Sequence, residues 1–100
     1  MCDGKIPSKG LFKVMFYLYI LKSNKNGKYY VGSTHDLENR LKQHNYGKIK
    51  STKSLVPLKI VYTERYSTNT DARKRELYIK RRKSRKYIDS LINDSLPNIP

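Results

Sequence analysis

Residues 17–47 read YLYILKSNKNGKYYVGSTHDLENRLKQHNYG, and this stretch decides the fold. It begins within a run of aromatic and aliphatic residues at 16–21, which is typical of a β-strand. Turn-forming residues follow at 23–27, and a second strand pattern covers 28–33. We therefore expect the two strands to form a hairpin.

Tyr19 and Tyr30 are expected on the same face of this hairpin, because an even-length loop places an odd-numbered residue beside an even-numbered one. A loop at 23–26 would place the two tyrosines directly opposite each other, and a loop at 24–27 would place them diagonally. The sequence leaves both registers open. The other face would carry Leu18, Ile20, Tyr29 and Val31, and we expect that face to belong to the core.

Residues 36–46 are predicted to form a helix that Thr34 or Asp36 caps and Gly47 ends. One stripe of this helix combines two leucines with two polar residues, at the i, i+3, i+4 and i+7 positions Leu37, Arg40, Leu41 and His44. Arg40 is a candidate phosphate clamp through its forked donors; the alternatives are solvation on the helix surface or a pair with Asp36. His44 relays a proton or binds a phosphate oxygen, or it is a satisfied structural histidine, the commoner case in isolation.

The rest of the chain predicts one more strand and two more helices, and we see no internal repeat. The expected segments are a basic loop at 48–54, a strand at 58–63 after Pro57, a helix at 71–83 capped by Thr68 or Thr70, and a helical segment at 84–92. Residues 1–14 are expected to be a flexible lead-in, 15–92 a single domain, and 93–100 a loose C-terminal tail.

Charge is the strongest compositional signal, with 22 Lys and Arg against 8 Asp and Glu and a net charge of +14. Such an excess favours a polyanion as partner. A membrane protein is disfavoured, because no apolar run approaches the ~18 residues of a spanning helix. Cys2 is the only cysteine, so no intramolecular disulfide forms, and the first residues lack a secretory signal. We therefore expect a cytoplasmic protein, with a monomer favoured.

The basic residues are expected to follow a nucleic-acid backbone and show no code for reading bases. Individually each is expected to be solvated, whereas together they predict strong salt dependence of binding. The expected nucleic-acid-binding residues are Lys28, Lys48, Lys50, Lys53, Lys80, Lys83 and Lys86, accompanied by Arg81, Arg82 and Arg85.

Glu76 interrupts this basic stretch and is a candidate metal ligand. Between Asp71 and Lys86 there are nine Lys or Arg and two acids. A single carboxylate suits Mg²⁺, which completes its shell with water and phosphate oxygens. Spacing alone favours an ion pair with Arg73 or Lys80.

Tyr19 and Tyr30 are candidates for positioning or deprotonating a water molecule. A tyrosine that acts as a base needs its pKa lowered from ~10, which neighbouring cations would do. The alternative is an ordinary strand residue, since this chain has nine tyrosines and tyrosine favours strands.

The joint spacing of these residues resembles the signature of the GIY-YIG nuclease superfamily, over about residues 15–92. The likeness is greatest to small stand-alone members related to the nuclease domain of the excision-repair C subunit. The two short motifs correspond to Tyr17-Leu18-Tyr19 and Tyr30-Val31-Gly32, and the family's arginine, histidine and glutamate correspond to Arg40, His44 and Glu76. Tyr17 replaces the first motif's glycine, which would narrow access for the substrate.

The resemblance implies an α+β fold, with a small three-stranded central antiparallel sheet flanked by helices in the order β-β-α-β-α-α. It implies a Mg²⁺-dependent endonuclease acting on DNA, including structured or branched DNA, with one metal ion held by Glu76 and Mn²⁺ as a substitute. Tyr30 would be the general base, Tyr19 its support, and Arg40 the group that stabilises the phosphoryl charge, with His44 assisting. The connection to excision repair suggests a role in DNA repair.

Two alternatives remain open at this point. The chain could be a non-catalytic nucleic-acid-binding module on the same fold, which would bind tightly and cut nothing. It could also be a basic ribosome-associated protein that prefers RNA and is indifferent to metal.

Overall fold

The computed structural model describes residues 14–95 of the chain. The elements are β1 (Phe16–Ser23), β2 (Tyr29–Thr34), α1 (Leu37–Asn45), the 3-10 helix η1 (Lys50–Leu55), β3 (Leu58–Tyr66), α2 (Asn69–Arg82) and α3 (Arg85–Ser95). The predicted α+β class and the order β-β-α-β-α-α are confirmed.

Three predicted boundaries need correction. The expected loop at 48–54 contains η1, the third strand runs three residues beyond 63, and α3 continues into the expected C-terminal tail as far as Ser95. Residues 1–13 of the predicted lead-in and residues 96–100 of the predicted tail lie outside the described residues.

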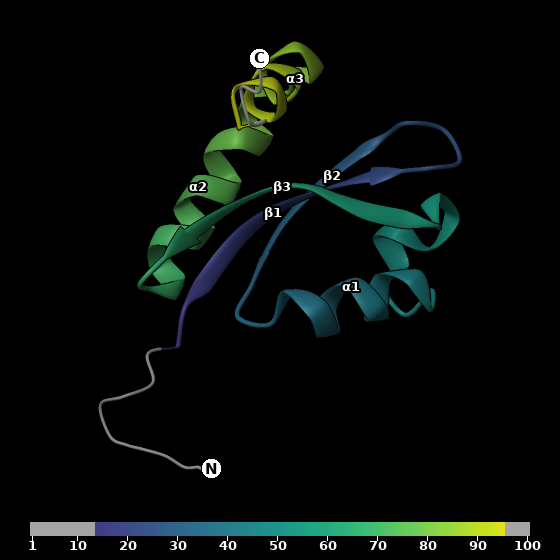
Figure 1. Ribbon diagram of the computed structural model, residues 1–100, viewed down its shortest axis with the longest axis horizontal. Coiled ribbons are helices and arrows are strands. Elements are labelled where there is room, and N and C mark those ends of the chain that lie inside the picture. Colours follow the sequence, from purple (N-terminus) through teal and green to yellow (C-terminus); the bar gives the residue numbers. More distant parts are fainter. Residues whose placement is uncertain (1–13, 96–100) are drawn as a thin grey trace, which may run out of the picture.

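The three strands form an antiparallel sheet in the order β2-β1-β3, so β2 is an edge strand (Figure 1). Tyr19 pairs with Gly32 and Leu21 pairs with Tyr30. This register corresponds to the loop at 24–27, so the two motif tyrosines are diagonal neighbours on one face. The hairpin closes where the Ser23 N–H donates to the Lys28 carbonyl at 2.8 Å.

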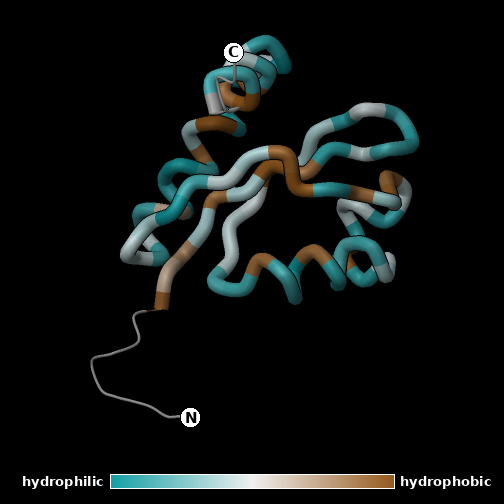
Figure 2. The backbone as a smooth tube through the Cα atoms, viewed as in Figure 1, coloured by the Kyte–Doolittle hydropathy of each residue, from teal (hydrophilic) through white to brown (hydrophobic). Residues whose placement is uncertain are grey.

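Both faces of the sheet are covered. α2 and α3 lie on one face and α1 on the other (Figure 1). The first core contains Leu18, Ile20, Val31 and Ile79, with Tyr29 packed against it, so this face is core as predicted. A second core forms beneath α1 from Tyr19, Leu21 and Leu58, with Tyr30, Leu37 and Leu41 packed against it. Figure 2 shows the hydrophobic residues concentrated on the central strands and hydrophilic residues along much of α2.

A β-bulge lets β3 contribute to both cores. Ile20 pairs with Tyr62 and Leu21 with Ile60, so Val61 is the extra residue on β3. The bulge shifts the alternation of side chains by one position. As a result Ile60 packs into the second core, whereas Tyr62 packs into the first.

The ends of the helices fix their positions relative to the sheet. Asp36 caps α1 by accepting from the Asn39 N–H at 3.1 Å, and Thr68 caps α2 by accepting from the Asp71 N–H at 3.1 Å. These contacts decide between the alternative caps that the sequence left open. α2 is also tied to β3, because Arg75 donates twice to the Glu64 carboxylate, at 2.9 and 3.1 Å.

Candidate active site

The Tyr19 side chain lies across the backbone of Gly32 on the neighbouring edge strand. A Cβ atom placed on Gly32 would be only 2.5 Å from the Tyr19 hydroxyl oxygen and 2.6 Å from Cζ. The phenol therefore needs a glycine beneath it in order to reach the β2 edge. Tyr19 is only 3% exposed, so its ring is held firmly in this position.

A hydrogen-bonded chain orients the Tyr19 hydroxyl. His44 Nε2 lies 3.1 Å from that hydroxyl, and His44 Nδ1 lies 2.6 Å from the Thr52 hydroxyl. We assign the Thr52 proton to the Ile49 carbonyl, 3.4 Å away, and the Nδ1 proton to the Thr52 oxygen. Nε2 is then unprotonated and accepts from Tyr19. His44 and Thr52 are both buried, at 1% and 0% exposure.

The pKa values of Tyr19 and His44 are both shifted towards the neutral side chain. Burial raises the pKa of Tyr19; Tyr30 and Glu76 raise it further, and Arg40 opposes them. Burial lowers the pKa of His44, and the nearby charge of Arg40 lowers it further. Both side chains are therefore neutral at neutral pH. Tyr19 is suited to positioning a water molecule and not to deprotonating one.

Tyr30 lies beside the same histidine and is less enclosed than Tyr19. The Tyr30 and His44 ring centroids are 5.2 Å apart, with an angle of 61° between the planes, an edge-on contact. The ring is half-buried, and the Lys80 ammonium lies 5.7 Å from its centroid. Of the two motif tyrosines, Tyr30 is the one with partial access to solvent and a cation beside it.

Arg40 lies on α1 next to this group, close enough for its charge to affect the pKa values of Tyr19 and His44. It is half-buried and lines a hollow of about 170 Å³ that also includes Thr34 and His35. Its guanidinium can therefore meet a phosphate that enters from solvent.

Glu76 comes from α2, on the opposite face of the sheet, and its side chain is 17% exposed. The Ser33 hydroxyl donates to Oε1 at 2.7 Å, and the Lys80 ammonium donates to Oε2 at 2.6 Å. The ion pair with Lys80 that spacing favoured is present. Glu76 is the less exposed partner of this pair, and a strand residue, Ser33, anchors it.

The predicted residues therefore meet around the edge of the sheet and not on a single face. Tyr19, Tyr30, Arg40 and His44 gather under α1, and Glu76 approaches from the α2 side of β2. Lys80 joins the two sides, because its ammonium bonds the Glu76 carboxylate and also lies near the Tyr30 ring. His44 is enclosed behind Tyr19 and contacts the hydroxyl of that residue.

The Glu76 carboxylate fits a single divalent cation. Within residues 14–95 no group of three or more His, Cys, Asp or Glu side chains could hold a metal. A site with one carboxylate suits Mg²⁺, which draws its other ligands from water and phosphate. Oε2 already binds one cationic group, the Lys80 ammonium, so the surroundings of this oxygen accommodate a positive charge.

The predicted nucleic-acid-binding lysines are all exposed and fall into separate groups. Lys28, Lys80 and Lys83 line one pocket beside β2. Lys48, Lys50 and Lys53 lie on the segment after α1, and Lys86 lies on α3. The positive charge therefore extends over both sides of the candidate site.

Sequence reasoning missed the residues that hold the site together. Ser33 and Thr52 had no assigned role, although they fix Glu76 and His44 respectively. Ser33 follows the second motif directly, and the alternation of strand side chains places it on the α2 face. Thr52 gave no signal, because it belongs to a stretch that reads as a polar loop.

Comparison with known proteins identifies the pattern. The family model of the GIY-YIG catalytic domain matches residues 15–88. A UPF0213 protein of Bacillus licheniformis is 40% identical over 77 residues, which cover 73% of this chain and 78% of the relative. A UPF0213 protein of Clostridium perfringens is 44% identical over 68 residues, covering 67% and 72%. The solution NMR structure of a UPF0213 protein from Bacillus halodurans matches with a TM-score of 0.53 and 29% identity, over 84% of this chain and 88% of the other. In the described part of the chain, no helix has the length and apolar character needed to span a membrane.

Proposed function

The chain belongs to the GIY-YIG catalytic domain family, and from that premise we propose that it is a metal-dependent endonuclease that hydrolyses phosphodiester bonds in DNA. The observation that carries the proposal is the arrangement at the β2 edge. Two phenols, a guanidinium and an anchored carboxylate approach one another there in a protein of net charge +14. Such a combination provides for water activation and for stabilisation of phosphoryl charge.

Each residue has a role that follows from its surroundings. Tyr30, partly exposed, is the group that accepts a proton from the attacking water. Tyr19 donates its own proton to His44, so its oxygen lone pairs remain free to orient that water. Arg40 binds the scissile phosphate and stabilises the charge that develops on it. His44 is a positioning residue, which fixes the Tyr19 hydroxyl.

Glu76 is the residue that would hold the metal ion, with Mg²⁺ preferred and Mn²⁺ as a substitute. When bound, the ion supplies charge stabilisation for the phosphate oxygens. Ser33 anchors Oε1 and Lys80 bonds Oε2, so the carboxylate that would take the ion is held in one orientation.

The decisive test is cleavage by Glu76→Ala. Supercoiled plasmid and branched DNA are incubated with Mg²⁺, Mn²⁺ or EDTA, and nicking is followed by gel electrophoresis. We expect metal-dependent cutting by the wild type, and a loss of at least about 100-fold in Glu76→Ala, with DNA affinity nearly unchanged. Glu38→Ala removes an exposed glutamate on α1 and serves as the matched control.

Wild-type cleavage rates in Glu76→Ala would overturn the metal role. Tight binding without cutting on any substrate would instead support a non-catalytic binding module. Competition between duplex RNA and DNA for the protein tests the third possibility. Tighter binding of RNA than of DNA, unchanged by added metal, would support a ribosome-associated protein.

A further inference from the structure

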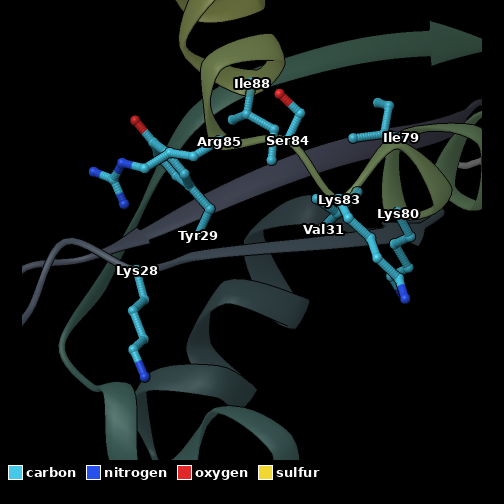
Figure 3. A pocket seen from close by; sticks show the side chains of 9 residues that line it. All are labelled: Lys28, Tyr29, Val31, Ile79, Lys80, Lys83, Ser84, Arg85 and Ile88. Carbon is cyan, nitrogen blue, oxygen red and sulfur yellow. The ribbon is translucent and has the colours of Figure 1, made fainter.

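A pocket of about 280 Å³ lies where α2 turns into α3, against the edge strand β2 (Figure 3). Its apolar lining comes from Val31 on β2, Ile79 on α2 and Ile88 on α3. The volume is close to the lower end of the ~300–1,000 Å³ of small-molecule sites. It suits a ligand with one small ring system and a short polar extension.

The rim of this pocket is cationic. Among its lining residues in the described part of the chain, four are Lys or Arg and none is acidic. Figure 3 shows Arg85 beside Tyr29 at one end of the pocket and Lys80 with Lys83 at the other, whereas Lys28 extends away. The ligand that this arrangement favours is therefore an anion with an apolar or aromatic body.

Tyr29 and Arg85 lie against each other at their end of the pocket, and the Lys22 ammonium also lies 5.8 Å from the Tyr29 centroid. The Arg85 guanidinium lies 4.7 Å from the centroid of the Tyr29 ring and donates to the Gly27 carbonyl at 2.9 Å. The Tyr29 hydroxyl donates to Asp89 at 2.5 Å, which holds the ring from the other side. Stacked aromatic and guanidinium groups of this kind bind the flat faces of nucleobases.

Lys83 has a backbone conformation that favours glycine. It is the residue that ends α2, with φ +48° and ψ 37°, the left-handed region in which glycine is the common choice. Its side chain lines the pocket, as does that of Lys80.

We propose that this pocket binds a nucleoside monophosphate. The base packs on the apolar lining beside Tyr29 and Arg85, and the phosphate lies between Lys80 and Lys83. A phosphate monoester carries nearly two negative charges, more than a singly charged diester. It would meet the Lys83 ammonium and the Lys80 ammonium, which also donates to Glu76. The inference rests on the proposed function in taking a nucleic-acid component as the ligand. It adds a second site that adjoins the groups assigned to cleavage, because Lys80 lines the pocket and also bonds Glu76.

The test is a titration of the metal-free protein with deoxyadenosine 5′-monophosphate, followed by NMR of the methyl groups of Val31, Ile79 and Ile88. Inorganic phosphate and deoxyadenosine are titrated separately. We expect these methyl signals to shift, and the nucleotide to bind at least about tenfold more tightly than either fragment. Equal binding of nucleotide and phosphate, with no methyl shifts, would overturn the inference.

Lys83→Gly is the most informative variant, because glycine suits the backbone at this position and the fold is therefore retained. We expect it to weaken nucleotide binding about tenfold through the loss of a charge-assisted hydrogen bond. Lys74→Ala removes an exposed charge from α2 outside the pocket, and should bind as the wild type does. Unchanged binding by a folded Lys83→Gly protein would overturn the inference.

Two further arms distinguish the source of the nucleotide and separate this inference from the proposed function. Tighter binding of a 5′-phosphorylated oligonucleotide than of the mononucleotide would assign the pocket to a strand end, and the reverse order to a free nucleotide; both outcomes support the site. DNA cleavage by a wild-type protein that does not bind the nucleotide would overturn this inference alone. Nucleotide binding by a protein that cuts nothing would support it and overturn the catalytic proposal.

Discussion

Gly32→Ala is expected to destabilise the protein and to displace Tyr19 from His44. The new Cβ would lie 2.5 Å from the Tyr19 hydroxyl oxygen, 2.6 Å from Cζ and 3.2 Å from Cε1. Ordinary carbon contacts are ~3.5–4.0 Å, so the ring must move by about 1 Å. Because Tyr19 is only 3% exposed, the core that surrounds it resists this movement.

The sign of the stability change makes this a sharp test. Replacing a strand glycine with alanine normally stabilises a protein by roughly 0.5–1 kcal/mol, because glycine loses more conformational freedom on folding. Overpacking of a core costs about 1–3 kcal/mol. We therefore expect a net loss of about 1–2 kcal/mol in the free energy of unfolding, measured by urea denaturation.

Activity should fall more steeply than stability. A ring movement of about 1 Å would stretch the 3.1 Å contact between the Tyr19 hydroxyl and His44 Nε2 beyond hydrogen-bond range. The control is a double-mutant cycle with Tyr19→Leu, which removes the ring and should cost less stability in the Gly32→Ala background than in the wild type. A Gly32→Ala protein as stable and as active as the wild type would refute the close contact between these two residues.

Three further outcomes are expected. Ser33→Ala removes the donor to Glu76 Oε1, and should weaken Mn²⁺ binding, measured by calorimetry, about tenfold while the fold persists. Burial lowers the pKa of His44, so the unfolded state binds more protons. Stability should therefore decrease as pH falls below ~6.5, the usual histidine value. The free energy of unfolding of His44→Gln, measured by urea denaturation at several pH values, should lack this decrease. Thr68→Ala should cost about 1 kcal/mol of stability through loss of the α2 cap, without changing the rate of cleavage per folded molecule.

Local patterns were sufficient to predict most of the elements. The run of apolar residues in β1, the turn residues after it and the spacing of Leu37 and Leu41 each determine structure through nearby contacts. The register of the hairpin was left open because it depends on a distant one. Ser23, whose N–H closes the hairpin, also donates its hydroxyl to the Leu55 carbonyl at 2.6 Å, 32 residues away.

The same limit applies to the candidate site. The odd sum of their residue numbers predicted that Tyr19 and Tyr30 share one face of the hairpin, and the strand pairs confirm it. Spacing alone could not show that Glu76 approaches from the other face, because that depends on how α2 packs against β2. Nor could it show that Thr52 forms a hydrogen bond with His44, because Thr52 lies in a segment without apolar periodicity.

The direction of the hydrogen bonds behind Tyr19 has a consequence for proton transfer. The last acceptor in that series is the Ile49 carbonyl, a peptide oxygen with no proton to pass on. This hydrogen-bonded chain can therefore orient the Tyr19 hydroxyl, but it cannot transfer protons to bulk water. In the proposed reaction the proton of the attacking water would therefore pass to Tyr30 and leave on the side that is open to solvent.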